Sequence, residues 1–200
     1  MSLYEILSDE NVVESINNNL DYLVKCIPEI KYMMGFEHKH PHHHLDVWQH
    51  TLLALSFSEN DFDIRLTLLL HDIGKPFSFQ EKDGIRHFNG HPKVSAIMSY
   101  DILKRIGFEE DYIQKICYYI KNHDNPISNK LIENNYNDAI FLYKIQKCDA
   151  LAHHPEKIEK RKRRRQDASN FNRLRKSPKD ETVQTRSTRK KESDYDIGLI

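Results

Sequence analysis

The chain has little glycine, little cysteine and no long apolar run: six of its 200 residues are glycine and three are cysteine. The cysteines are far apart, odd in number and without a CxxC pair, which argues against a disulfide framework and indicates a reducing compartment. No stretch approaches the roughly 18 apolar residues of a membrane-spanning helix, and the N-terminal residues lack the features of a secretory signal. We therefore expect a soluble, cytoplasmic protein with no membrane segment.

Strand signals are also scarce. Val-rich alternation is nearly absent, whereas apolar residues recur at intervals of three and four along most of the chain. This spacing predicts an all-α domain of about six main helices, with a loop or small hairpin at residues 77–90 whose turn is Asp83-Gly84. The helices are expected at residues 9–26, 45–57, 62–73, 91–106, 109–122 and 138–152, with a shorter piece at 128–135.

Polar residues and prolines mark several helix ends. Ser8 and Asp9 are candidates to cap the first helix, and Asp46 is expected in the first turn of the second, where a carboxylate suits the helix dipole. His91 is expected at the N-cap of the fourth helix, because Pro92 then takes the first helical position.

The equal totals of 30 basic and 30 acidic residues hide an asymmetry. Residues 1–155 hold 15 Lys/Arg against 22 Asp/Glu, a net charge of −7, whereas residues 156–200 hold 15 against 8, a net charge of +7. The last part has few apolar side chains and cannot support a core. The sequence therefore predicts one folded domain at 1–155 and a basic, disordered tail at 156–200.

Histidine is the residue in excess: the chain has twelve, and ten lie between residues 38 and 123. Such an excess indicates metal or proton chemistry more than packing. In LTLLLHDIGKP, at residues 66–76, an apolar run delivers His71 and Asp72, and Gly74 and Pro76 then stop the helix. This pattern is typical of an imidazole and a carboxylate placed together at a cleft, although a core helix with a solvated end has the same pattern.

Ligand-type residues fall on several of the predicted helices. His50 lies on the second, His71 and Asp72 end the third, and Asp149 lies on the buried face of the sixth, where an unpaired charge is costly. Nitrogen and oxygen ligands without thiolate suit Mn, Fe, Co, Ni or Mg as well as Zn.

The order H…HD…D resembles the HD superfamily of metal-dependent phosphohydrolases. The stretches HHHLDVWQHTLLAL, LLLHDIGKP and HFNGHPKVSA are most similar to the HD domain attached to bacterial CCA-adding tRNA nucleotidyltransferases. The resemblance covers about residues 40–153. It implies a helical domain that holds a divalent ion at His50, His71, Asp72 and Asp149 and hydrolyses a nucleotide or RNA-end phosphate with a metal-activated water.

Some HD enzymes hold a second ion through two further histidines, and His91 and His123 match these positions in order. Asp72 would then bridge the two ions. The resemblance leaves one or two ions open, because His91 also suits a helix N-cap and His123 suits the negative end of a helix dipole.

The resemblance also implies catalytic and substrate-binding residues. Asp72 would orient the attacking water, and Lys75 would balance charge on the phosphate oxygens, unless Lys75 is an ordinary cation at a helix end. His43, His44 and Arg86 are further candidates to contact the substrate phosphate, although a solvated loop also suits His43 and His44, and a surface position also suits Arg86. The other histidines of the HKHPHHH run are expected in a solvated loop: His38, His40 and His42.

One carboxylate pair resembles the metal-binding pair of a nucleotidyltransferase head. Asp61-Phe62-Asp63 falls at a helix start, with no preceding strand or Gly-Ser turn, so capping by Asn60 or Asp61 explains it. We therefore expect no polymerase head in these residues.

Two functions from different classes agree with the sequence. The first is a stand-alone HD phosphohydrolase, either a phosphodiesterase or a phosphomonoesterase. The alternative is a catalytically silent HD module that binds RNA or a nucleotide as a regulator. The basic stretch Lys157–Arg165 suits non-specific contact with nucleic acid, although a solvated face has the same composition.

Overall fold

The computed structural model describes residues 2–39 and 45–153. The elements of these residues are α1 Leu3–Leu7, α2 Val12–Asn18, α3 Leu20–Cys26, the 3-10 helix η1 Pro28–Tyr32, α4 Val47–Ser56, α5 Phe62–Leu70, α6 Lys75–Ser78, β1 Gln80–Lys82, β2 Ile85–His87, α7 His91–Ile106, α8 Glu110–Asn122, α9 Asn129–Asn134 and α10 Tyr136–Leu151.

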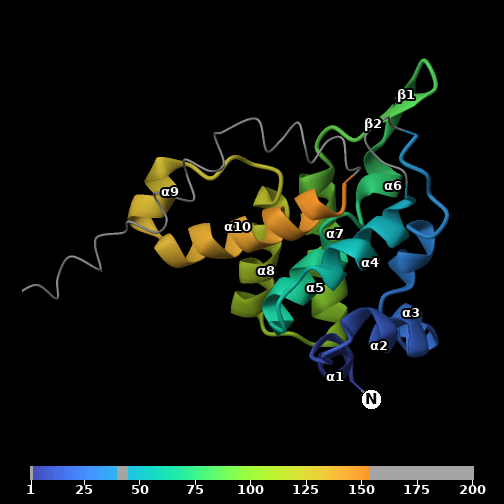
Figure 1. Cartoon of the computed structure of the whole chain (residues 1–200), viewed down its shortest axis with the longest axis horizontal. Helices are drawn as coiled ribbons and strands as arrows, with labels where there is room; N and C mark the ends of the chain where they lie inside the picture. Colours follow the sequence, from blue (N-terminus) through green and yellow to red (C-terminus); the bar gives the residue numbers. More distant parts are fainter. Residues whose placement is uncertain (1, 40–44, 154–200) are drawn as a thin grey trace, which may run out of the picture.

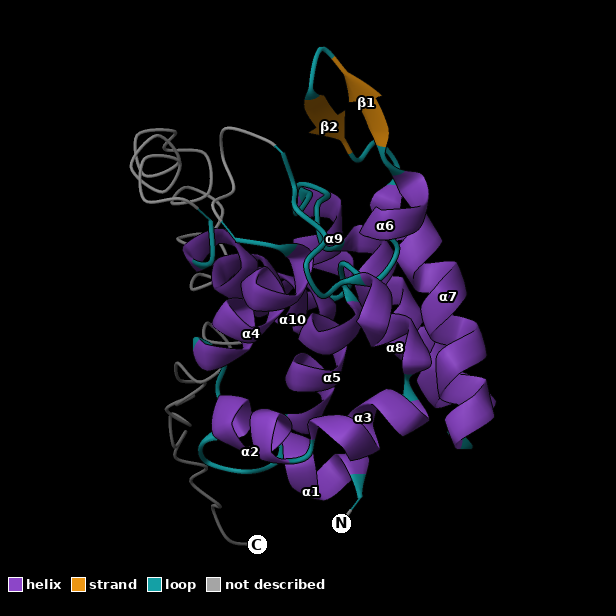
Figure 2. Cartoon of the chain, turned by 90° about the vertical axis from the view of Figure 1, so that its right-hand side faces the viewer, coloured by secondary structure: helices purple, strands orange, loops and turns teal. Residues whose placement is uncertain are grey.

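Helix α5 is the central element of an all-α bundle, and α1, α4, α7, α8 and α10 all pack against it (Figures 1 and 2). The helices α1 to α3 cover one end of the bundle, and the hairpin β1–β2 projects from the other end. The predicted fold class is therefore confirmed. Among the described residues, no helix has the length and apolar character that a bilayer crossing requires.

The apolar run before His71 explains the central place of α5. Residues 64–70 are all buried, so this helix has no solvent face, as expected of a helix that is apolar on every side. Its one buried cation, Arg65, donates hydrogen bonds of 2.7 and 2.6 Å to the carbonyls of Leu7 and Asp9. These bonds fasten the N-terminal helices to the central one.

Helix α5 ends at Leu70, three residues before the predicted end, because the chain turns tightly after it. His71 is the C-cap, and the amides of Ile73 and Lys75 bond the carbonyls of Leu70 and Asp72. The short helix α6, which the sequence did not predict, then begins at Lys75.

The predicted helix at 9–26 is wrong in its extent. The segment forms α2 and α3, which are separated at Asn19, and α1 precedes them with its own capping box between Ser2 and Glu5. An asparagine side chain competes with the backbone hydrogen bonds of a helix. The side-chain amide of Asn19 donates a hydrogen bond to the backbone carbonyl of Ser15 at 2.8 Å. Neither predicted cap, Ser8 or Asp9, begins α2, whose N-cap is Asn11.

The starts of α4 and α7 also differ from the prediction. Asp46 is the N-cap of α4, rather than part of its first turn, and forms a capping box with Gln49. Gly90, at φ 80°, is the N-cap of α7, so His91 is the first helical residue. Glycine takes the N-cap because it adopts this left-handed conformation without a steric cost.

The hairpin and the third helix start agree with the sequence. Asp83 and Gly84, at φ 54° and 75°, form the turn between β1 and β2, as the type I′ geometry requires. Asp61 caps α5 by accepting a hydrogen bond from the amide of Ile64 at 3.0 Å. The predicted tail at 156–200 and the proposed boundary at residue 155 lie outside the described residues.

Candidate metal centre

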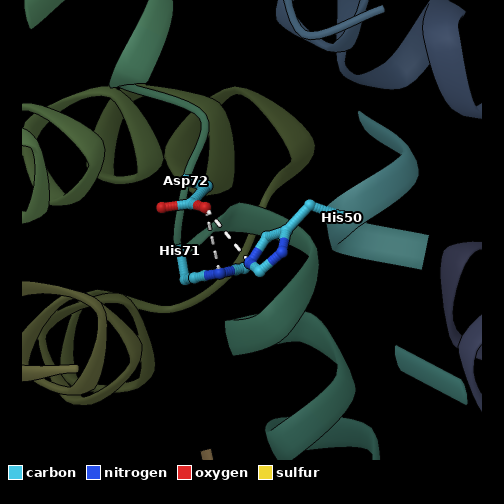
Figure 3. Close-up of side chains that lie close together, drawn as sticks. All are labelled: His50, His71 and Asp72. Carbon is cyan, nitrogen blue, oxygen red and sulfur yellow. Dashed lines mark ion pairs between the residues drawn. The ribbon is translucent and has the colours of Figure 1, made fainter. Parts of the chain in front are cut away.

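Three helices bring the first group of four ligand-type side chains together. His50 comes from α4, His71 and Asp72 follow α5, and Asp149 lies near the end of α10. Nε2 of His50 is 2.9 Å from Oδ1 of Asp149 and 3.7 Å from Oδ2 of Asp72. Nε2 of His71 is 3.3 Å from Oδ2 of Asp72, and Figure 3 shows both imidazoles directed at this carboxylate.

A second group lies on the other side of the Asp72 carboxylate. Oδ1 of Asp72 is 3.1 Å from Nε2 of His91, at the start of α7, and 3.9 Å from Nε2 of His123, just after α8. The two Nε2 atoms are 3.2 Å apart. Asp72 therefore directs one oxygen to each group, which is the arrangement that a carboxylate bridging two ions requires.

Backbone carbonyls hold the outer nitrogen of each of these four imidazoles. The Nδ1 atoms of His50, His71, His91 and His123 lie 2.6 to 3.3 Å from the carbonyl oxygens of residues 152, 68, 88 and 120. A carbonyl only accepts, so Nδ1 carries a hydrogen and Nε2 faces the centre of the site, where it offers a lone pair when the ring is neutral. Metal-ligating histidines are oriented in this way.

Two buried atoms at the centre lack hydrogen-bond partners among the described residues: Nε2 of His71 and Oδ1 of Asp72. Polar atoms buried in this way are costly unless another group satisfies them. A divalent cation in the first group would satisfy Nε2 of His71, and a second cation beside Oδ1 of Asp72 would also separate the lone pairs of His91 and His123. The donor set therefore fits divalent metal ions, with nitrogen and oxygen ligands and no thiolate.

The charges inside the site favour a cation. Burial alone lowers the pKa of His71, but the carboxylates of Asp72 and Asp149 outweigh it and raise this pKa to about 10. Burial raises the pKa of Asp72, but His71 and Lys75 hold it well below its usual range. Burial, reinforced by His71, lowers the pKa of His123 to about 4, which keeps this imidazole neutral.

Lys75 lies inside the site rather than at a solvated helix end. Its side chain is 7% exposed, and Nζ donates to Oδ2 of Asp72 at 2.6 Å. Nζ also lies 3.2 Å from Nε2 of His38, whose Nδ1 faces the carbonyl of Leu45 at 2.9 Å. The expectation that His38 lies in a solvated loop is wrong, since the residue is 1% exposed. Burial and the neighbouring Lys75 lower its pKa to about 3.

His153 is the second histidine that sequence reasoning missed. It is buried, and its Nδ1 donates to the backbone carbonyl of Asp149 at 2.8 Å. The centroids of its ring and the His50 ring are 5.2 Å apart. His50, Asp149 and His153 form a further group of potential metal ligands. A sequence signal existed, because His153 is four residues after Asp149, which is about one helical turn, and directly follows the predicted end of the helix.

The other predicted substrate contacts have different outcomes. Arg86 borders the cleft, but its guanidinium donates to the carbonyl of Glu37 and the carboxylate of Glu81 and lies over Phe36 and Phe79. Arg86 therefore connects the hairpin to the loop between η1 and α4. Its contact with substrate stays a prediction. Outside the described residues lie His40, His42, His43 and His44.

A cleft of about 680 Å³ leads from the ligands to the surface. Asp72, Asp149, His91 and His123 lie along it, together with Lys75. This size suits a small organic or nucleotide substrate. The outer wall includes His87, Asn89, Lys93, Lys121 and Asp124.

Comparison with known proteins agrees with this geometry. The HD domain family matches residues 42–184. The chain belongs to the HD domain family. The HD domain is characteristic of a superfamily of metal-dependent phosphohydrolases, and the resemblance inferred from the sequence is confirmed.

Two relatives of this HD domain protein carry the names of transferases. The CC-adding tRNA nucleotidyltransferase of Thermus thermophilus is 30% identical over 104 residues, which are 48% of this chain and 24% of that protein. The A-adding tRNA nucleotidyltransferase of Deinococcus radiodurans is 33% identical over 111 residues, which are 52% of this chain and 25% of that protein. The chain thus spans about a quarter of the length of these curated relatives.

Proposed function

We propose that this HD domain protein hydrolyses a phosphate ester in a nucleotide or at an RNA end, with one or two divalent ions. The observation that carries the proposal is the Asp72 carboxylate, which directs one oxygen to each of two imidazole groups. Between them, Nε2 of His71 and Oδ1 of Asp72 are buried without hydrogen-bond partners in the described residues. A site built only to stabilise the fold would not bury such atoms.

The residues divide into two sets of ligands that share Asp72. The first set is His50, His71, Asp72 and Asp149, and the second is His91, His123 and Asp72. A divalent ion at such a site polarises a phosphoryl oxygen and lowers the pKa of bound water to about 7. The ligands do not select strongly among Mn, Ni, Co, Fe, Mg and Zn.

Lys75 assists the reaction from a position beside the metal ligands. Its ammonium group lies 2.6 Å from Asp72 and borders the cleft, so it can neutralise charge on a phosphate that reaches the carboxylate. It also keeps Asp72 ionised, which lets this carboxylate orient an attacking water through a hydrogen bond. His38 holds the ammonium from the opposite side.

The relatives support the class of substrate. Both are named as tRNA nucleotidyltransferases, so the proteins similar to this chain act on the end of an RNA. Phosphate hydrolysis at an RNA end would use the same kind of substrate with a different reaction.

The test combines metal analysis with turnover. We expect the purified chain to contain a transition metal and to hydrolyse bis(p-nitrophenyl) phosphate or p-nitrophenyl phosphate when supplied with Mn, Ni, Co or Mg. Asp72→Asn should lose both metal and turnover, and His71→Ala should lose turnover and the ion of the first set. The control Asp21→Asn, on the exposed face of α3, should keep both metal and turnover. A wild-type chain that holds no metal and turns nothing over refutes the proposal. RNA or nucleotide binding without turnover would instead favour the silent regulatory module.

A further inference from the structure

The cleft at the metal centre continues into a second hollow. A groove of about 490 Å³ runs between α7 and α8, and Lys93 and Lys121 line both this groove and the metal cleft. Lys93 follows His91 by two residues on α7, and Lys121 precedes His123 by two residues on α8. The two lysines therefore flank the passage from the groove to the second group of ligands.

Both lysines are available to bind an anion. They are exposed, and within residues 2–39 and 45–153 neither has a carboxylate at ion-pair distance. Lys39, Lys115 and Lys144, in contrast, are paired with glutamate or aspartate. Two unpaired cations beside a phosphate-processing site form an electrostatic footprint for phosphate groups beyond the one that reacts.

The walls of the groove supply apolar and aromatic surface. Ile97 on α7 is 58% exposed and Tyr118 on α8 is 39% exposed, although both are large apolar side chains. Ile97 is four residues from Lys93, and Tyr118 is three from Lys121, so each pair shares a helix face. Among the described residues that line the groove, Asp101 is the one carboxylate, and it lies towards the end of α7 that is away from the metal centre.

We infer that the α7–α8 groove, formed by Lys93, Ile97, Tyr118 and Lys121, binds the single-stranded end of a nucleic acid and leads its terminal phosphate into the metal centre. This inference rests on the proposed function and narrows its substrate class to a strand end rather than a free mononucleotide. Lysines that follow the backbone beside an aromatic ring that stacks on a base are the usual components of single-strand sites. A duplex offers no unstacked base to Tyr118.

Binding can be measured without turnover, so the two proposals are tested separately. The full chain is titrated into a fluorescein-labelled RNA hexanucleotide, with EDTA present to stop hydrolysis, and anisotropy is recorded at several salt concentrations. We expect Lys93→Glu/Lys121→Glu to lower affinity at least tenfold and to reduce the slope of log affinity against log salt by about 1.4, as two lost phosphate contacts require for a single strand. Tyr118→Ala should lower affinity about fivefold or more and leave this slope unchanged.

The matched control is Lys25→Glu/Lys31→Glu, which changes the net charge equally on exposed residues of α3 and η1. It should change affinity less than twofold, and an RNA duplex of the same length should bind several-fold more weakly than the single strand. Equal affinities for the two double variants would overturn the inference, as would equal affinities for duplex and single strand. A chain that holds no metal and hydrolyses neither nitrophenyl substrate would reject the proposed function alone, because the binding result does not depend on turnover.

Discussion

The Nε2 atoms of His91 and His123 lie 3.2 Å apart, although each ring also turns Nδ1 to a backbone carbonyl. Because a carbonyl can only accept, both rings carry their hydrogen on Nδ1 when neutral, and two lone pairs then face each other. A cation between them removes this repulsion. Oδ1 of Asp72, 3.1 Å from His91, supplies the negative charge. This relationship favours a second ion, which the sequence left open.

The first prediction concerns the number of ions. We expect about two divalent ions per wild-type chain after loading with Mn or Ni, and about one in His123→Ala, because the first set of ligands remains intact. The ions are counted by mass spectrometry of the desalted protein. Asn122→Ala, one residue away, is the control and should keep both ions. A wild-type chain that saturates with one ion contradicts the prediction.

The second prediction concerns the contact between His38 and Lys75. Without the imidazole that holds it, the ammonium group has more freedom beside Asp72, so His38→Ala should lower kcat about tenfold, or about 1.4 kcal/mol in activation free energy. Metal content should not change. His38→Gln should recover part of the loss, because its carboxamide oxygen can accept from Nζ.

The variant Lys75→Met tests whether His38 acts by positioning the ammonium group of Lys75. It should lower kcat at least as much as His38→Ala, and the double variant should be no worse than Lys75→Met alone, because both changes act through one group. Additive losses in the double variant would show that His38 acts independently of Lys75.

The sequence located the centre of the site because its ligands are tied to helix ends and faces. His71 and Asp72 end an apolar run, and Asp149 lies on a buried helix face, so their helices determine where they meet. His38 lies in an aperiodic run of histidines, where no local pattern shows which ring turns inward. Its burial depends on contacts with Lys75 and His50, which are distant in sequence.

The fold also has features that the local sequence predicts and features that depend on contacts between residues distant in sequence. Periodicity predicted helices, the Asp83-Gly84 pair predicted the hairpin turn, and residue type predicted a cap at Asn60 or Asp61, because these features depend on neighbouring residues. The end of α5 at Leu70 and the short helix α6 were not predicted, since they depend on the approach of α7. A Cβ on Gly74 would lie 2.5 Å from the backbone nitrogen of Ser95, so only glycine lets these segments come together.

The third prediction concerns the close contact between Gly74 and Ser95 of α7. Gly74→Ala should lower the free energy of unfolding by about 1–3 kcal/mol through overpacking, and it should reduce metal content because the clash moves α7, and with it His91, away from Asp72. Chemical denaturation and metal analysis measure the two effects.

Gly107→Ala is the control for Gly74→Ala. Gly107 has φ 98° and open space around it, so alanine there should cost about 1–2 kcal/mol through backbone strain alone. Metal content should be unchanged, because Gly107 lies at the far end of α7. Equal metal content in both variants would show that the contact between Gly74 and Ser95 does not position the site.

The last prediction concerns the stabilisation that a bound ion provides. An ion that binds only the folded chain adds about 2.7 kcal/mol at a concentration one hundred times its Kd, which raises Tm by about 5–10 °C for a domain of this size. Protons compete with the ion for imidazole nitrogens, so the stabilisation weakens as the pH falls. We therefore expect Mn or Ni to raise Tm at pH 7.5 and to have little effect at pH 5, as measured by thermal unfolding against an EDTA-treated sample. Asp72→Asn, which changes the ligand that both sets share, should show no rise at either pH, and a rise in this variant equal to that of the wild type would place the ion elsewhere.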